Sequence, residues 1–236
     1  MFNPQIKANV ILFVFNLIVV LSLAQPNQID LQIGFGKFQM TDLKGLQDSF
    51  IKESIIPLSK TVEFPDYFVF DLKYEHEIKD KFFTGGSVGH RSTGGRLHYA
   101  DYSGEVYSNQ KVSAYSIALL GGLYLLNDKK NIVPLYLRVG GNFTRVSLEN
   151  GIIVGTQKQE QSDLFESFGM LAEPGVSYRR IIRQLFTGVD IGYELNFNGN
   201  LFYSSDKNLF LVNDSGNPVQ AQWDGLRVRL SIGYRF

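Results

Sequence analysis

Apolar and polar residues alternate along most of the chain after about residue 27, a pattern that predicts strands whose two faces meet different surroundings. The pattern is clearest over 226–236, where one face carries six apolar residues and the other carries Arg227, Arg229, Ser231, Gly233 and Arg235. The same alternation recurs at 29–36, 68–75 and 185–197, and in weaker form at about 81–90, 114–126, 134–146 and 166–179. The sequence therefore predicts eight strands, with a bulge or bend at Pro174 in the sixth.

The connections between these segments alternate in length. Short polar turns are expected near 79–80, 127–130 and 180–183, whereas the remaining connections are long loops at about 38–66, 91–112, 147–164 and 198–222. This layout is typical of an all-β, eight-stranded antiparallel up-and-down transmembrane β-barrel with short periplasmic turns and long extracellular loops.

The first long loop contains a candidate helix. Within 42–54, Leu43, Leu46, Phe50 and Ile51 fall on one helical face. Thr41 or Asp42 is a plausible cap, and the helix would lie over the barrel mouth or at the interface, or would bind a partner.

Aromatic residues are expected at both ends of the apolar faces. Strands that run up and down in chain order place at their long-loop ends Phe35, Phe68, Tyr115, Phe143, Phe168 and Phe197, with Trp223 just before the last strand. Their short-turn ends carry Tyr74, Phe82, Tyr178, Tyr234 and Phe236. Two aromatic girdles around an aliphatic middle are what the two interfaces of a bilayer select, so we expect the apolar face to point outward.

The opposite faces then form a narrow interior filled by side chains. Its expected charge network comprises Asp30, Asp71, Lys73, Glu75, Arg138, Glu173, Arg179, Asp190, Glu194, Arg227, Arg229 and Arg235. Because buried charges are costly without partners, opposite signs should meet. The strand order predicts pairing of Glu194 with Arg227 or Arg229, and of Asp30 with Arg235 across the closing seam.

The first 24 residues have the features of a signal peptide. Lys7 precedes an apolar run over 10–21, and small residues follow at Ser22 and Ala24, so cleavage is expected before Gln25. The run is shorter than a membrane-spanning helix requires, which makes an anchor the weaker alternative. The predicted organisation is a signal peptide at 1–24 and a barrel domain at 25–236.

Composition narrows the chemistry. The 23 basic and 23 acidic residues balance, so a nucleic-acid partner is not expected. The absence of cysteine excludes disulfides and thiolate chemistry. His90 and His98 flank a polar segment with Asp101 and Glu105 nearby, which leaves open a hydrolase at the rim. No spacing fixes a nucleophile against a base, so a polar surface segment is favoured, and no catalytic residue, metal site or cofactor is predicted.

The chain resembles the small outer-membrane barrels of the OmpA/OmpX type, including the outer-membrane β-barrel proteins of Bacteroidetes-like bacteria. The resemblance covers about 27–236 and includes a terminal strand that ends in Tyr234-Arg235-Phe236. In this signature Tyr234 and Phe236 are the residues that barrel-assembly machinery recognises, although the usual glycine would fall at Ser231 and stands here at Gly233. The resemblance implies outer-membrane lipid and the assembly machinery as partners.

The favoured function is a non-enzymatic structural or surface-interaction role in the bacterial outer membrane, with a plugged, salt-bridged lumen and an extracellular partner for the long loops. A small porin-like solute channel and a rim-active hydrolase are the alternatives from other classes, and a soluble ligand-carrying barrel is a further one.

Overall fold

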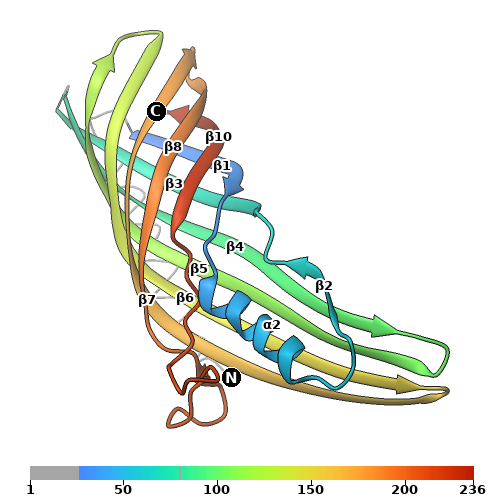
Figure 1. The fold of residues 1–236 in the computed structure, drawn as a ribbon. Coiled ribbons are helices and arrows are strands. Elements are labelled where there is room, and N and C mark those ends of the chain that lie inside the picture. Colours follow the sequence, from blue (N-terminus) through green and yellow to red (C-terminus); the bar gives the residue numbers. More distant parts are fainter. Residues whose placement is uncertain (1–26, 80) are drawn as a thin grey trace, which may run out of the picture.

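A computed structural model describes residues 27–79 and 81–236, which form a closed antiparallel barrel (Figure 1). Its eight strands are β1 (Asn27–Gly36), β3 (Tyr67–Lys79), β4 (Phe82–Ala100), β5 (Gly104–Asn127), β6 (Asn131–Val154), β7 (Gln157–Ile182), β8 (Leu185–Asn198) and β10 (Gly225–Arg235). Each strand pairs with the next, and β1 closes the ring against β10. The predicted all-β fold of eight antiparallel strands is confirmed. The predicted signal peptide lies outside the described residues.

The closing seam brings the two ends of the barrel domain together. Asn27 N donates to Phe236 O at 2.8 Å, and Phe236 N donates to Asn27 O at 2.9 Å. Pairing between β1 and β10 then continues without a register shift. We call this end of the barrel, which also carries the short turns, the lower end, and the opposite end the upper end.

The two faces of each barrel strand differ as the alternation predicts. On β10, Leu226, Val228, Leu230 and Ile232 are 39–62% exposed, whereas Arg227 and Arg229 are at most 1% exposed. A strand has a side-chain period of two, so one register fixes the orientation of every residue on it. The apolar face of the barrel is therefore its outside, and the charged face is its inside.

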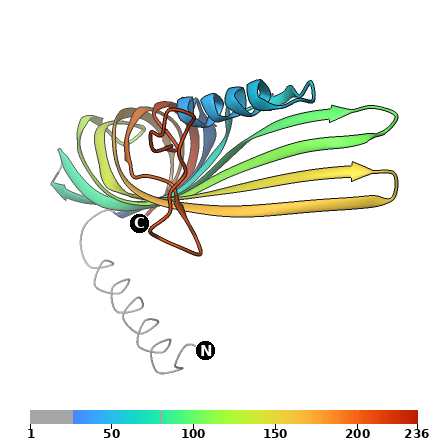
Figure 2. The ribbon, with the colours of Figure 1, turned by 60° about the horizontal axis from the view of Figure 1, so that its bottom comes forward.

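Four strands are much longer than their alternating apolar segments. The predicted loops 91–112 and 147–164 are instead hairpin extensions, because β4 pairs with β5 as far as Ala100 and β6 pairs with β7 as far as Val154. We name this upper part of β4–β7 the projecting sheet. Figure 2 shows its two hairpins, green and yellow, reaching side by side beyond the barrel. The prediction was wrong here because the outer face of these extensions is polar, so the apolar contrast that marks a strand is lost.

The other two long connections fold back over the upper end. The first contains α2 (Thr41–Glu53) and β2 (Ser59–Glu63), which pairs with β4, and the last contains β9 (Phe202–Tyr203), which pairs with β7. Within the described residues, no helix has the length and apolar character needed to cross a membrane.

The helix predicted over 42–54 is present, but its predicted cap is wrong. Met40 occupies the cap position with φ 46°, and no side chain caps the helix. The Asp42 carboxylate instead accepts hydrogen bonds from Gln220 N and Gln222 Nε2, each at 3.0 Å. It therefore ties α2 to the segment that leads into β10.

Pro174 does not create a bulge. The β7 ladder is interrupted at residues 173–174 on the side of β8, and pairing resumes at Gly175 in the same register. On the side of β6, Pro174 stays in register opposite Leu137. Proline lacks an N–H, so it breaks the ladder locally without shifting it.

Candidate functional site: the charged interior and the projecting sheet

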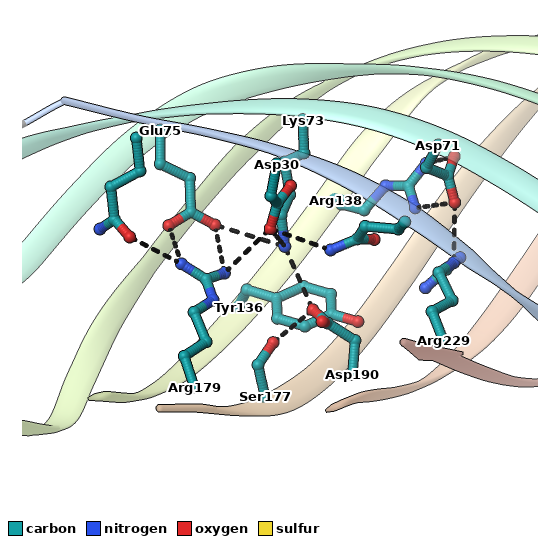
Figure 3. A network of polar contacts seen from close by, with 12 residues as sticks. Asp30, Asp71, Lys73, Glu75, Tyr136, Arg138, Ser177, Arg179, Asp190 and Arg229 are labelled. Atoms are coloured by element: carbon teal, nitrogen blue, oxygen red, sulfur yellow. Dashed lines mark hydrogen bonds and ion pairs between the residues drawn. The ribbon is translucent and has the colours of Figure 1, made fainter. Parts of the chain in front are cut away.

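The middle of the barrel holds a cluster of ion pairs around Lys73 on β3 (Figure 3). The Lys73 ammonium lies 3.1 Å from Asp190, 3.4 Å from Glu75 and 3.6 Å from Asp30. Arg179 on β7 reaches the same cluster through a two-pronged contact with Glu75 at 2.5 and 2.6 Å. Strands β1, β3, β7 and β8 are thus connected through the interior as well as around the wall.

A second cluster lies beside it and pairs two carboxylates with two guanidiniums. Arg229 on β10 binds both oxygens of Glu173 at 2.7 and 2.8 Å and also lies 2.7 Å from Asp71. Arg138 on β6 contacts the same two acids at 3.2 Å. Tyr136 adds a hydrogen bond to Glu173 at 3.1 Å. Planar guanidiniums suit this arrangement because they bind carboxylates through parallel hydrogen bonds.

Towards the upper end, Glu194 on β8 is held by two arginines. Arg91 on β4 donates to it directly, and the Arg227 Nε atom lies 3.4 Å away. These guanidiniums also cover aromatic rings, since Arg91 lies 4.9 Å from the ring centre of Trp223 and Arg227 lies 4.7 Å from that of Phe38. Arg91 and Arg227 therefore join the ionic interior to the aromatic rings of an apolar layer above it.

The predicted pair between Asp30 and Arg235 is wrong. The register of the seam places Arg235 opposite Gln28, and places Gly233 opposite Asp30. Arg235 instead lies 2.8 Å from Glu77 at the lower end, while Asp30 pairs with the central lysine. The predicted contact between Glu194 and Arg227 is present.

The structure brings the predicted charged residues together in one interior. Eleven of the twelve are buried there, and Arg235 is half-buried at the lower end. Sequence reasoning missed Arg91 and Glu77. Arg91 was assigned to a loop because β4 continues beyond the segment in which alternation is visible. Arg91 nevertheless lies on the same face as Ser87 and Gly89, so extending the period of two along the strand would have placed it in the interior.

The interior charges balance among the described residues. Seven acidic side chains are buried, against six buried basic side chains and the half-buried Arg235. Burying this many charges is costly, and a network is tolerated when each ion has partners of opposite sign. Removing one partner should therefore be far more disruptive than removing an exposed charge.

Trp223 is not part of an aromatic girdle. It is fully buried, packs edge-on against Phe38 at 4.8 Å between ring centres, and donates from its indole nitrogen to Thr144 Oγ1 at 2.9 Å. Leu43 and Leu46 of α2 belong to the same buried cluster. The prediction failed because Trp223 precedes β10 in a segment that folds inward, where the strand period no longer applies. This apolar cluster closes the upper end of the interior.

A second apolar layer lies below the ionic one. It is formed by buried residues of β4, β5 and β6 near the short turns: Phe83, Leu120, Tyr124, Ile132 and Tyr136. The interior is thus a stack of an upper apolar layer, a charged middle and a lower aromatic layer.

The outside of the barrel carries a row of aromatic side chains at one height. Phe35 is paired with Phe68, and their ring centres are 4.6 Å apart. Phe143 is paired with both Tyr115 and Phe168. The other predicted girdle residues, apart from Trp223, are exposed or half-buried on the outer face: Tyr74, Phe82, Tyr178, Phe197, Tyr234 and Phe236.

The outer surface changes character immediately above this row. On β6 the residue that follows Phe143 on the same face is Arg145, and on β7 the residue before Phe168 on that face is Glu166; these two form an ion pair at 2.9 Å. Lys207 from the last long loop also pairs with Glu166, at 2.9 Å. The apolar belt therefore ends sharply, and the outer face of the projecting sheet is polar.

The inner face of the projecting sheet carries a hollow beside α2. This pocket, of about 310 Å³, has Phe50 and Leu58 on one side and is lined on the other by residues of β5, β6 and β7 that include Val106, Ile152 and Gln161. Phe50 is the residue of α2 that lines it.

The two histidines considered for hydrolysis do not share a site. His90 faces outward and lies 4.7 Å from the ring of Tyr115, within the aromatic row. His98 is eight residues further along β4, about 26 Å at the usual rise per residue. Its ring contacts Glu105 at 3.0 Å. Within the described part of the chain, no hydrogen bond joins either ring to a serine hydroxyl, and no group of three or more His, Cys, Asp or Glu residues is placed to hold a metal.

Comparison with known proteins gives structural likenesses only. No family model and no curated relative matches the chain. Among solved structures, OprG of Pseudomonas aeruginosa is 11% identical with a TM-score of 0.45, covering 90% of this chain and 96% of OprG. Ail, the attachment invasion locus protein of Yersinia pestis, is 11% identical with a TM-score of 0.38, covering 91% of this chain and all of Ail.

A major outer-membrane protein of Thermus thermophilus is 12% identical with a TM-score of 0.41, covering 89% of this chain and 99% of that protein. These are small outer-membrane barrels, the class that the sequence resembles. At such identities and TM-scores they carry no argument about function. Any inference about function therefore has to come from the surfaces of this barrel.

Proposed function

We propose that this chain is a non-enzymatic integral protein of the bacterial outer membrane, with a plugged barrel that holds the projecting sheet outside the cell. The observation that supports this most directly is the outer surface. A belt of exposed apolar side chains is bounded above by a row of aromatic rings. The next outward-facing residue above that row is charged on both β6 and β7. A bilayer is the environment that matches such a belt.

The height of the belt supports the same proposal. On β10 the outer face is apolar from Leu226 to Phe236, a span of about 33 Å along the strand at the usual rise per residue. Strands of such barrels are tilted by about 40°, which reduces this span to about 25 Å across the membrane. That is about the height of the apolar band of outer-membrane barrels.

The interior favours a structural or surface role over the alternative of a solute channel. Charged groups from seven of the eight strands form ion pairs with one another, and apolar layers lie above and below them. Side chains that bind one another in this way leave little room for a column of water. The arrangement of the histidines gives a hydrolase no support.

Export through a cleavable signal peptide at 1–24, insertion by the barrel-assembly machinery through Tyr234 and Phe236, and contact with outer-membrane lipid complete the proposal. An extracellular partner would meet the projecting sheet. No cofactor and no nucleic acid are part of it.

Two measurements test the proposal. The expressed chain should fractionate with outer membranes and require detergent to stay dispersed, and protease added to intact cells should cut the upper loops. A chain that remains in solution without detergent would contradict the membrane assignment.

The plugged interior is tested separately in planar bilayers. The purified protein should give no stable unitary conductance. Steps of one reproducible size would favour the channel, provided that a Glu173→Gln variant, which alters only the interior, changes their size or selectivity.

A further inference from the structure

The lower part of β7 is enclosed by neighbouring strands, but its first residues form an open edge of the projecting sheet. Residues 157–163 pair with β6 on one side, and the pairing of β7 with β9 begins only at Phe165. All residues from Gln157 to Ser162 are exposed. An open edge is a template for another strand.

The hydrogen-bonding groups of this edge can be assigned. The carbonyl of Leu164 accepts a hydrogen bond from Ser204 N at 2.8 Å on the side away from β6. In an antiparallel strand every second residue points its N–H and C=O to the same side. Lys158, Glu160 and Ser162 therefore present their N–H and C=O groups to the open edge.

The sequence of this edge is complementary to itself. From Gln157 to Gln161 it reads Gln-Lys-Gln-Glu-Gln, with Lys158 and Glu160 placed symmetrically about Gln159. Lys158 lies 2.6 Å from Glu160 on the same strand, and hydrogen bonds from Lys158 and from the Tyr107 hydroxyl lower the pKa of the Glu160 carboxyl.

We propose that this edge of β7 pairs antiparallel with the same edge of a second copy of the chain, in a register centred on Gln159. This deepens the proposed surface role by naming the partner, and it rests on that role for its setting. In this register each Lys158 lies opposite the partner copy's Glu160, and both residues have their backbone groups free to bond across the interface. Opposite charges that face each other across strands are favourable, and like charges are not.

Neighbouring registers are worse. A register centred on residue 160 places glutamate opposite glutamate, and one centred on residue 158 places lysine opposite lysine. A register centred on residue 161 would need the Leu164 carbonyl, which Ser204 already occupies. The charges thus select one register from those that the backbone allows.

Antiparallel pairing also determines which membranes are joined. The two β7 strands run in opposite directions, so the two barrels lie at opposite ends of the combined sheet. Such a pair bridges two facing membranes. A single contact of this length is weak, and many copies on each surface would act together.

Cysteine cross-linking tests the register, since the chain has no cysteine of its own. In detergent, Gln159→Cys should form a disulfide-linked dimer under mild oxidation, because residue 159 faces itself across the interface. Gln161→Cys is the matched control: it would lie about 13 Å from its copy, counting four residues along the strand, which is too far for a disulfide. Equal cross-linking of the two variants would overturn the proposal.

Charge reversal tests the recognition. Added to Gln159→Cys, either Lys158→Glu or Glu160→Lys should reduce dimer yield roughly tenfold, because each places like charges at two symmetric positions. Mixing these two variants should restore a heterodimer, since every facing pair is then opposite in sign. Phosphatidylcholine vesicles that carry the proteins should aggregate in the same pattern. Unchanged dimer yields, or no recovery on mixing, would overturn the proposal.

The cross-linking result is independent of the membrane assignment. A barrel that stayed dispersed without detergent would contradict the proposed function, yet its Gln159→Cys yield could still be measured in solution. Unchanged heat-dependent gel mobility of each variant would show that the barrel itself is folded.

Discussion

Two glutamates of β7 show how strongly solvent exposure determines the contribution of an ion pair to stability. Glu173 and Glu166 lie on the same strand, and each contacts two cationic side chains. Glu173 is fully buried between guanidiniums that are themselves buried, whereas the partners of Glu166 are more than half exposed. Water screens the second site and not the first, so the same chemical group should contribute very differently to stability.

We therefore predict that Glu173→Gln lowers the free energy of unfolding by about 3–5 kcal/mol, because it leaves two buried guanidiniums to share the single carboxylate of Asp71. Glu166→Gln, the matched control, should cost less than about 1 kcal/mol. Urea unfolding in micelles, followed by the gel mobility of the folded barrel, measures both. Similar losses of unfolding free energy for the two variants would show that water reaches the interior network more than its burial implies.

The sequence allowed most of the interior residues to be predicted, but not their partners. A period of two places Asp30 and Arg235 on the same face, whereas the partner of each depends on the stagger between strands, which alternation leaves open. Trp223 shows a different limit. It has the composition and position of a girdle residue, and only the inward path of the chain from residue 219 to 223 places it inside.

Among the elements, α2 is held to the barrel by side-chain packing and by hydrogen bonds to the segment before β10 rather than by the strand ladder. Leu43 and Leu46 bury one face of α2, and Asp42 ties the helix to the segment before β10. The barrel ladder does not pass through the helix. The helix should therefore be able to detach while the eight-stranded ring stays closed.

Leu43→Ala is expected to weaken the docking of α2 by about 2–5 kcal/mol through the cavity that it leaves. Limited proteolysis within 38–58 should become faster, while the urea midpoint of the barrel changes little. Lys52→Ala, on the exposed side of the last turn, should leave proteolysis unchanged. A large drop in the barrel midpoint for Leu43→Ala would mean instead that helix and wall unfold together.

At this level the helix and the barrel strands could be predicted, because both have an apolar face that contrasts with a polar one. The projecting sheet could not. Above Tyr115 the outer face of β5 carries Ser113, Lys111 and Asn109, so the strand continues without the alternation that reveals it. Its strands are defined by their pairing, within the β4–β5 and β6–β7 hairpins and between β5 and β6, and the apolar pattern does not contain that information.

For the complete barrel, the last strand closes the ring against β1. The aromatic pair at its end is the assembly signal proposed above. The closing contact of Phe236 uses its backbone, while its ring is about half exposed. Assembly in the cell and stability of the finished barrel should therefore respond differently to a change of this side chain.

Phe236→Ala should reduce the amount of folded protein in the outer membrane several-fold, while refolding into detergent micelles remains close to that of the parent chain. Phe35→Ala, which removes an exposed aromatic ring from the upper row, serves as the control and should leave assembly largely intact. Comparison of membrane levels in cells with refolding yields in micelles gives the answer. Equal losses in both settings would assign the ring a purely structural role.

The hydrogen bonds between Asn27 and Phe236 mean that the first and last barrel residues are already neighbours. A short peptide linker could join them, and new ends could be cut in the turn at 128–130, giving a circular permutant with the same order of strands around the ring. Such a chain should refold in micelles. In the cell it would lack the terminal phenylalanine of the proposed assembly signal. A single permuted gene would thus separate the residues that the barrel requires for stability from those that it requires for assembly into the outer membrane.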